Sequence, residues 1–240
     1  MCSLSWIQTG QTIVICFNRD EQRKRSIAKL PQVYSNNDCK VLMPLDRDAA
    51  GTWLIVNEQA ICICLLNLYE NELKEERVVV ELGEKRSRGL LVRELSDVND
   101  FESFNQRLIN KDLMLYLPFR LVFISLLEKY QFVWDGKKLE RQELSSFTSS
   151  TSYLSSKVLQ KRQEHFAEIA EMTKESLINL HSKHSKGGDE YSICMHRDDA
   201  KTVSMSLIEI NHKEINYQYW DGSPCEQENI YRQKLTVVRN

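Results

Sequence analysis

The segment 60–66, Ala-Ile-Cys-Ile-Cys-Leu-Leu, is apolar at every position and places the strongest constraint on the fold. Because it is short, rich in β-branched residues and followed by a polar asparagine, its pattern predicts a strand buried on both faces. A strand of that kind has to lie between two layers of structure. With 42% apolar residues in 240, the chain can bury one large core. We therefore expect a single layered domain spanning residues 1–240.

Alternating apolar residues predict further strands around this segment. Residues 3–7 and 12–17 should form a hairpin across Gln8-Thr9-Gly10-Gln11, and residues 52–56 should pair with 60–66 around Asn57-Glu58. Residues 18–50, which contain Pro31 and Pro44, are polar and irregular, and we expect a long surface loop there. Strands are also predicted at residues 119–127, 130–134, 138–144, 191–196, 202–210, 214–220 and 231–238.

Helical spacing of apolar residues occurs in two segments. Residues 100–109 carry Phe101, Phe104 and Leu108 on one side, with Asp97 or Asn99 as a possible N-cap. Residues 156–181 form the longest helical pattern and should lie across a sheet as one helix. Strands at both ends of the chain with helices between them favour a layered α+β domain.

Charge and targeting signals exclude several classes of function. The chain has 32 Lys and Arg against 34 Asp and Glu, so nothing favours binding to nucleic acid or to an anionic membrane. No apolar run approaches the roughly 18 residues of a spanning helix, and no secretion leader is recognisable, so we expect no stable membrane insertion. Seven cysteines without a secretion signal indicate free thiols in a cytoplasmic protein.

Cys2 follows the initiator Met1 and is the first candidate for chemistry. Aminopeptidases remove an initiator methionine that precedes a small residue, and the mature chain would then begin with Cys2. Its α-amino group, with a reference pKa of about 7.7–8.0, could accept the proton of its own thiol. The same residue would then be nucleophile and base.

Several motifs occur in a fixed order along the chain, and together they resemble one family. They are Asn18-Arg19-Asp20-Glu21, Leu30-Pro31, Asp46 before Ala50-Gly51-Thr52-Trp53-Leu54, Asn67, Ser87-Arg88-Gly89 and the late block 194–204. The set resembles the NRDE, or transport-and-Golgi-organisation, family. That family is similar to the N-terminal-nucleophile amidohydrolases of the penicillin V acylase and cholylglycine hydrolase group. The resemblance implies a four-layer αββα sandwich with the nucleophile on an inner strand.

The resemblance also implies roles for individual residues. Cys2 would be the nucleophile, Asp20 would anchor its amino group, and Arg19 would lower the thiol pKa. The order of these residues differs from the amidohydrolase pattern, which leaves Glu21 as an alternative to Asp20. Asn67 would supply an oxyanion-hole donor, and a turn-forming asparagine is the competing interpretation.

Three further positions complete the predicted site. Arg197 matches a late arginine near the nucleophile, while His196 would face the other way on a strand. A second asparagine of the amidohydrolases would fall at Thr148-Ser149-Ser150, where Ser149 becomes a candidate substrate contact. Trp53 should fill the core or wall the pocket.

We expect no cofactor and no metal. Cys62-x-Cys64 and Cys194-x-His196 could share a face on neighbouring strands, but their spacing is not that of a zinc finger. The chain also lacks a P-loop, a dinucleotide fingerprint, a His-Glu-x-x-His motif and a Gly-x-Ser-x-Gly elbow.

Three functions remain open on the sequence. The leading hypothesis is a cysteine amidohydrolase or acyl transferase that acts on a linear, non-peptide acyl amide through a thioester. The alternative is a non-catalytic binding or trafficking protein for haem or an acyl lipid, and a third possibility is a redox-sensing thiol at Cys2. The expected partner is thus a small acyl compound or haem, and the oligomeric state is not predicted.

Overall fold

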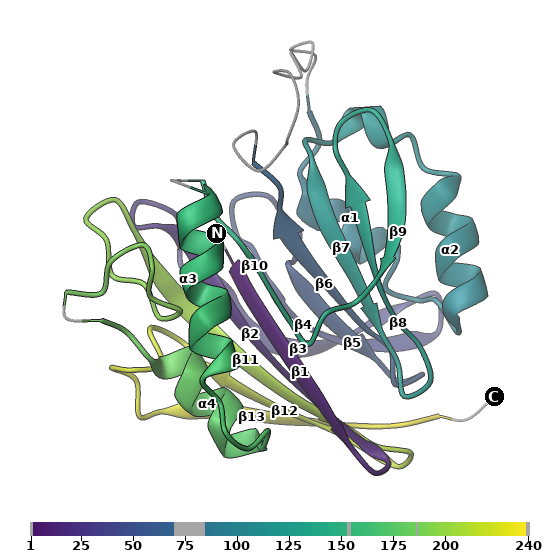
Figure 1. Cartoon of the computed structure of the whole chain (residues 1–240). Helices are drawn as coiled ribbons and strands as arrows, with labels where there is room; N and C mark the ends of the chain where they lie inside the picture. The colour runs from purple at the N-terminus through teal and green to yellow at the C-terminus, as the bar shows by residue number, and fades with distance from the viewer. Residues whose placement is uncertain (1, 70–84, 153–154, 186, 239–240) are drawn as a thin grey trace.

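Two antiparallel sheets face one another, and helices cover their outer faces (Figure 1). The structure, a computed structural model, describes residues 2–69, 85–152, 155–185 and 187–238. Helices α3 and α4 lie on one sheet, and α1 and α2 lie on the other. The predicted α+β, four-layer αββα sandwich is confirmed.

The first sheet contains the N-terminal hairpin in its middle. Its order is β10-β1-β2-β11-β12-β13, so the first strand of the chain pairs on both sides. The strands are β1 (Cys2–Thr9), β2 (Thr12–Gln22), β10 (Phe147–Ser150), β11 (Ala200–Ile210), β12 (Glu214–Trp220) and β13 (Ile230–Thr236).

The second sheet runs through the chain in sequence order, from β3 to β9. Its strands are β3 (Lys29–Asn36), β4 (Cys39–Leu45), β5 (Leu54–Asn57), β6 (Cys62–Asn67), β7 (Phe119–Ile124), β8 (Lys129–Trp134) and β9 (Leu139–Glu143). The helices are α1 (Arg88–Glu94), α2 (Phe101–Ile109), α3 (Ser155–Ala167) and α4 (Lys174–Ser182), with a short 3-10 turn at Leu113–Leu115.

Strand β6 lies in the centre of the second sheet and is buried on both faces, as its sequence predicts. Cys62, Cys64 and Leu66 face the first sheet across the main core, where they meet residues such as Leu4. Ile63 and its alternate neighbours face α1 and α2 instead. The two layers that a fully apolar strand requires are therefore a sheet on one side and helices on the other.

Strand β1 also divides its side chains between two layers. Cys2 and Leu4 point into the core between the sheets, whereas Ser3 and Ser5 point toward α3 and α4. Successive side chains of a strand alternate between faces, so the hydroxyls reach the helices while the thiol reaches the interior. This division determines what surrounds Cys2.

The prediction of an irregular loop over residues 18–50 was wrong. Strand β2 continues to Gln22, and β3 and β4 form a second hairpin there. Asn37 and Asp38, at φ 45° and 64°, make its tight turn, a conformation that these residues tolerate well. Pro31 fits because β3 is an edge strand, where one side of the backbone needs no partner.

Two later predictions also need correction. The long helix expected over residues 156–181 is broken, because Thr173 and Ser176 form a capping box that starts α4 as a separate helix. The strand expected at residues 191–196 is irregular, with His196 in an isolated bridge to Lys201. The cap of α2 is Asp100 rather than Asp97 or Asn99.

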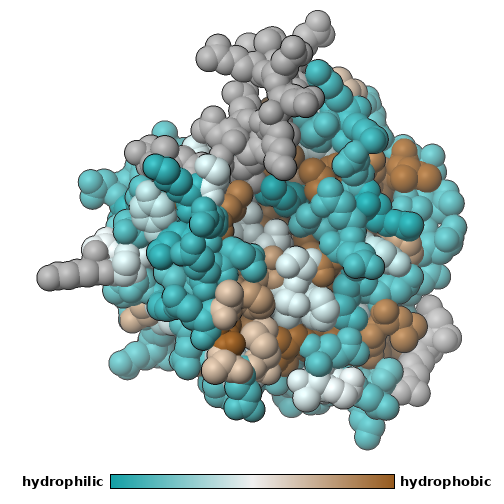
Figure 2. Space-filling view, in the orientation of Figure 1, coloured by the Kyte–Doolittle hydropathy of each residue, from teal (hydrophilic) through white to brown (hydrophobic). Residues whose placement is uncertain are grey.

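Hydrophilic residues dominate the face drawn in Figure 2. Hydrophobic residues gather there in a strip through the middle of that face, between α3 and strands β8 and β9. Among the described helices, none is long and apolar enough to span a bilayer.

His181 joins α4 to β1 and makes stability depend on pH. Its Nε2 lies 2.8 Å from Ser5 Oγ, and burial, with a smaller contribution from the charge of Arg162, lowers the pKa of His181 to about 3. An unfolded histidine titrates near 6.5. Between pH 6.5 and about 3 the unfolded chain binds more protons than the folded one. The free energy of unfolding therefore decreases by up to about 1.4 kcal/mol per pH unit as the pH falls.

We expect His181→Gln to flatten the dependence of unfolding free energy on pH between about 6.5 and 4. Urea unfolding of both proteins at several pH values measures the two slopes. His212→Gln, in the turn between β11 and β12, is the control and should keep the wild-type slope. Equal slopes for His181→Gln and wild type would contradict the assignment.

Candidate active site

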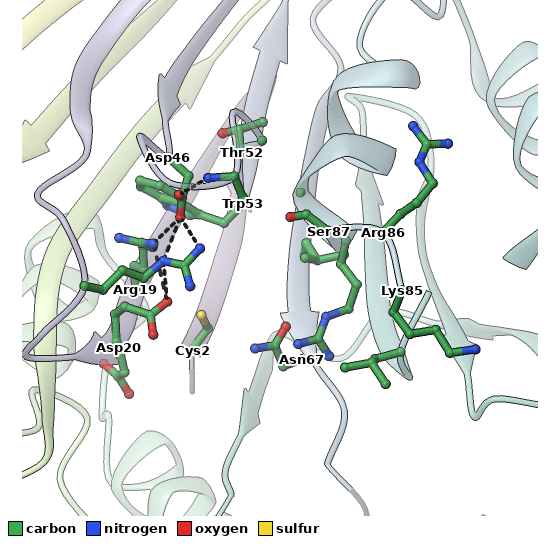
Figure 3. A pocket seen from close by; sticks show the side chains of 18 residues that line it. Cys2, Arg19, Asp20, Asp46, Thr52, Trp53, Asn67, Lys85, Arg86 and Ser87 are labelled. Atoms are coloured by element: carbon green, nitrogen blue, oxygen red, sulfur yellow. Dashed lines mark hydrogen bonds and ion pairs between the residues drawn. The ribbon is translucent and has the colours of Figure 1, made fainter. Parts of the chain in front are cut away.

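A pocket of about 390 Å³ opens where the ends of β1, β2 and β6 meet the start of α1, and Cys2 lies within it (Figure 3). Its size falls in the range of small-molecule sites. Most of its lining is charged or polar. The described residues around it are Cys2, Arg19, Asp20, Glu21, Arg25, Asp46, Ala49, Gly51, Thr52, Trp53, Leu65, Asn67, Lys85, Arg86, Ser87, Arg88, Gly89 and Leu117.

Cys2 begins β1, an inner strand of the first sheet, and is held from both sides. It pairs with Arg19 on β2 and with Ser150 on β10. Its backbone nitrogen donates to Ser150 Oγ at 3.0 Å, and its carbonyl accepts from Ser149 Oγ at 3.1 Å. The residue is 7% exposed, and burial raises the pKa of the thiol, as does the charge of Asp20, while the charge of Arg19 has a smaller, lowering effect. The thiol therefore needs a base to become an effective nucleophile.

The guanidinium of Arg19 is fixed on three sides. It lies 4.1 Å from the centre of the Trp53 ring, donates to Asp46 Oδ2 at 2.8 Å and lies 3.4 Å from Glu21. A guanidinium stacked on an indole and paired with a carboxylate has little rotational freedom. Trp53 thus forms a wall of the pocket, and Arg19 is oriented by its neighbours rather than by a ligand.

Asp46 organises this side of the pocket, although sequence reasoning quoted it only as part of a motif. Its Oδ1 accepts the amides of Asp48 and Ala49 at 2.9 and 3.0 Å, and its Oδ2 receives both Arg19 and Arg25. One carboxylate therefore shapes a turn and offsets two cations. Its place directly before a tight turn is the signal that could have identified it.

Asp20 forms an ion pair inside the protein with a residue that sequence reasoning missed. Its Oδ1 accepts from Thr202 Oγ1 at 2.7 Å, and its Oδ2 lies 3.7 Å from Arg162 Nη2. Burial raises the pKa of Asp20, and the charge of Arg162 opposes that shift. Arg162, which is fully buried in α3, also donates to Ser3 and Ser149.

The sequence did contain a signal for Arg162. Val158, Arg162 and Phe166 follow one another at four-residue spacing, which places the arginine on the apolar stripe of a helix. A charged residue on such a stripe is buried against a partner. The interpretation of residues 156–181 as one helix across a sheet did not predict that this arginine points inward.

Asn67 ends strand β6 and faces the pocket from the second sheet. Figure 3 shows it on the opposite side of Cys2 from the Arg19 and Asp46 pair. Its Nδ2 donates to the Tyr69 hydroxyl at 3.2 Å. A side-chain amide carries two N–H donors, so this bond engages one of them.

Arg88 is a second residue that sequence reasoning named in a motif but did not place in the site. It begins α1, donates to the carbonyl of Pro118 at 2.8 Å and lines the pocket. Burial lowers the pKa of Arg88, while the charges of Tyr69, Cys2 and Glu21 oppose that shift. Arg88 therefore lies near enough to stabilise negative charge at Cys2.

The position of α1 is set by contact between two backbones. A Cβ on Gly51 would lie 2.6 Å from the carbonyl carbon of Gly89, and one on Gly89 would lie 2.9 Å from the nitrogen of Thr52. Neither position can carry a side chain without movement of the main chain. The motifs around Gly51 and Gly89 are 38 residues apart in the sequence, and they contact each other directly in the structure.

Ser149 does not belong to the described lining of the pocket. It pairs with Ser3 and shares its face, so its hydroxyl points toward Arg162. Ser150 pairs with Cys2 and is the hydroxyl that contacts its backbone nitrogen. The hydroxyl of Ser149, the predicted substrate contact, faces α3 because alternate residues of a strand face opposite layers. Neither Ser149 nor Ser150 is among the described residues that line the pocket.

Arg197 is not brought to the pocket either. Its Nε and Nη2 donate to the carboxylate of Asp199 at 2.9 and 2.7 Å, and its carbonyl accepts from Arg23. The segment around it is irregular, so the alternation assumed for a strand does not apply. Arg162, which also lies late in the chain, is near Cys2 and Asp20.

Comparison with solved structures supports the same fold. A *Caenorhabditis elegans* N-acylethanolamine-hydrolyzing acid amidase orthologue aligns with a TM-score of 0.63 at 10% identity, covering 99% of this chain and 100% of that one. The C2A mutant of a conjugated bile acid hydrolase from *Clostridium perfringens* aligns with a TM-score of 0.55 at 13% identity, covering 100% and 97%. At this identity the likeness concerns the fold alone.

Sequence comparisons assign the family. A search among curated proteins finds no significant match. The profile of the family described as "Transport and Golgi organisation 2" matches residues 1–220, which include β1, the pocket and most of the first sheet. The chain therefore belongs to the Transport and Golgi organisation 2 family.

Proposed function

We propose that the protein is an N-terminal-cysteine amidohydrolase or acyl transferase that acts on a linear, non-peptide acyl amide. One observation carries the proposal: Cys2 lines a pocket with Asn67 and Arg88, while its backbone nitrogen meets Ser150 and the carboxylate of Asp20 lies nearby. Nucleophile, cation and amide donor thus share one small site. Met1 lies outside the described residues, and the proposal requires its removal.

The amino group of a mature Cys2 supplies the base. With Met1 gone, the nitrogen that now donates to Ser150 Oγ becomes an amine. It accepts the thiol proton as Sγ attacks the substrate carbonyl carbon, and the resulting ammonium lies near the carboxylate of Asp20. Arg162 and Thr202 hold that carboxylate in place.

The tetrahedral intermediate needs donors for its oxyanion. Asn67 Nδ2 provides a neutral, directional donor, and its second N–H remains for the substrate while the first contacts Tyr69. Collapse of the intermediate breaks the carbon–nitrogen bond, and the ammonium of Cys2 returns the proton to the leaving amine. Water, or another acceptor in a transferase, then resolves the thioester.

The wall of the pocket formed by α1 and the residues before it favours a substrate that carries an anionic group. Lys85, Arg86 and Arg88 all line this wall. Arg86 is paired with Glu94, whereas within the described residues Lys85 and Arg88 contact carbonyl oxygens and no carboxylate. On the opposite wall, Asp46 and Glu21 offset the charges of Arg19 and Arg25.

A binding or trafficking role for haem or an acyl lipid is the alternative. Haem is usually held by histidine, cysteine, methionine or tyrosine. Among the described lining residues, Cys2 alone is of these types. The experiments below separate this role from catalysis.

We expect the mature protein to lack Met1 and to form a covalent adduct at Cys2. Intact mass spectrometry before and after incubation with a panel of N-acyl compounds reports both events. Cys2→Ala should form no adduct and should lower turnover by on the order of 10⁴-fold or more, because the nucleophile is lost.

Cys39→Ala, in strand β4 of the other sheet, is the matched thiol control and should keep both adduct and turnover. Retention of Met1 in active protein would contradict the mechanism. If Cys2→Ala binds acyl compound or haem as well as wild type does, and neither protein turns over substrate, the binding role replaces the enzymatic one.

We expect Arg88→Gln to weaken selection for acyl amides with an anionic headgroup. Losing a charge-assisted hydrogen bond costs about 1.5–3 kcal/mol, which corresponds to roughly 10- to 150-fold in kcat/KM. Neutral-headgroup analogues should change much less. Paired kinetics on a carboxylate-bearing substrate and its neutral counterpart measure the ratio.

Arg86→Gln is the matched control, because Arg86 lines the same wall but is already paired with Glu94. It should change the ratio by less than Arg88→Gln does. An equal loss on charged and neutral substrates for Arg88→Gln would argue against headgroup recognition and for a role at Cys2 itself.

A further inference from the structure

A second cluster of reactive side chains lies outside the pocket. Cys194 and His196 precede β11, and Cys225 lies in the loop after β12. Their ligand atoms lie within 4.8 Å of one another: Sγ of Cys194 is 3.4 Å from Sγ of Cys225, and His196 Nε2 is 3.6 and 3.0 Å from the two sulfurs. Two thiols and an imidazole therefore converge on one point.

These separations are close to those of a zinc site. Bonds of about 2.3 Å to sulfur and about 2.0–2.1 Å to nitrogen in a tetrahedron place two sulfurs about 3.8 Å apart and a sulfur and nitrogen about 3.6 Å apart. The two separations that involve Cys225 have to lengthen, by about 0.4 Å to the other sulfur and about 0.6 Å to the imidazole nitrogen. Cys225, which is partly exposed in a loop, can move by that amount.

The backbone holds two of the ligands in position. The amide of Cys194 donates to the carbonyl of Lys183 at 3.0 Å, and the amide of His196 donates to the carbonyl of Gly188. Gly188 has φ +63°, and a Cβ there would lie 2.6 Å from Cβ of His196. Because Gly188 has no side chain, His196 can pack closely against it. This contact restricts the orientation of the His196 side chain.

The other nitrogen of His196 faces an acid. Glu226 Oε1 lies 3.7 Å from Nδ1, on the side of the ring opposite the sulfurs. Metal-binding histidines commonly have a carboxylate or carbonyl at their second nitrogen, which orients the ring. At 3.7 Å the contact is longer than a hydrogen bond, so Glu226 has to approach Nδ1 to complete that pattern.

We propose that Cys194, His196 and Cys225 bind a zinc ion. Two thiolates and an imidazole form a donor set that suits zinc. Cys225 and His196 both reach the surface, so water or a small ligand can take the fourth position. The grouping of Cys62-x-Cys64 with Cys194-x-His196, which the sequence disfavours, does not occur, because Cys62 and Cys64 are buried between the sheets.

The proposed zinc site would stabilise the position of Asp20 in the candidate active site through contacts with Thr202. The amide of Met195, between the two ligands, donates to Thr202 Oγ1 at 2.8 Å, and that hydroxyl donates to Asp20 Oδ1 at 2.7 Å. Ser223, two residues before Cys225, donates to the carbonyl of Thr202 at 2.8 Å. Metal bound by Cys194 and Cys225 would therefore join both segments that hold Thr202 against Asp20.

The test is metal content and cobalt spectroscopy on the reduced full-length protein. We expect one equivalent of zinc by elemental analysis. Cobalt substitution should give the sulfur-to-metal charge-transfer band and the intense visible bands of a tetrahedral thiolate site. Cys225→Ser and His196→Gln should each weaken binding by more than the about 10- to 100-fold typical of losing an outer-shell partner.

Cys39→Ser and Cys2→Ala are the controls and should leave the cobalt spectrum unchanged, which also separates this site from the chemistry proposed at Cys2. Absence of zinc together with absence of a cobalt–thiolate band in wild type overturns the proposal, whether or not the variants fold. A Cys194–Cys225 disulfide in protein that takes up no metal after reduction overturns it in favour of a redox pair.

Discussion

The pairing of β1 with β2 on one side and β10 on the other is the constraint on which the rest of the site depends. It sets Cys2 opposite Arg19 and Ser150 in the same plane. A slip of one residue would turn every side chain of β1 to the opposite face. The thiol would then face the helices, and the hydroxyls of Ser3 and Ser5 would enter the apolar core, where they would lose their present partners.

The same pairing explains why the motif at residues 18–21 contacts both the helical layer and the space between the sheets. Arg19 faces the space between the sheets, where Trp53 and Asp46 receive it. Asn18 faces the helices and donates to the carbonyls of His181 and Ile193 at 2.8 and 3.1 Å. Asp20 meets Thr202 and the fully buried Arg162. The motif therefore connects strand, pocket and helical layer.

Periodicity predicted much of the fold. The strands around β6 and the N-terminal hairpin were visible because their apolar residues alternate or run continuously. The hairpin of β3 and β4 was missed because Pro31 and Pro44 were interpreted as signs of an irregular loop, whereas Pro31 lies in an edge strand. The break before α4 was missed because the apolar spacing continues through it and the cap at Thr173 was not considered.

The residues of the site could be predicted where a local motif in or beside a strand contains them. They could not be predicted where only the packing of distant elements brings them together. Cys2, Arg19, Asp20, Trp53 and Asn67 all line one pocket, as the family motifs suggested. Arg162 and Cys225 come from elements far away in sequence, and only the packed structure brings them close. Ser149 and Arg197 were placed from the family resemblance, and both lie outside the described lining of the pocket.

The contact between Gly51 and Gly89 has a consequence for the wall of the pocket. Main-chain atoms touch there, so the distance between the start of α1 and the loop before β5 is set by the backbone. An exchange at a neighbouring position such as Arg88, which lines the pocket, alters the charge of this wall and leaves the backbone contact in place. One backbone arrangement can in this way bind molecules of similar width that differ in chemistry.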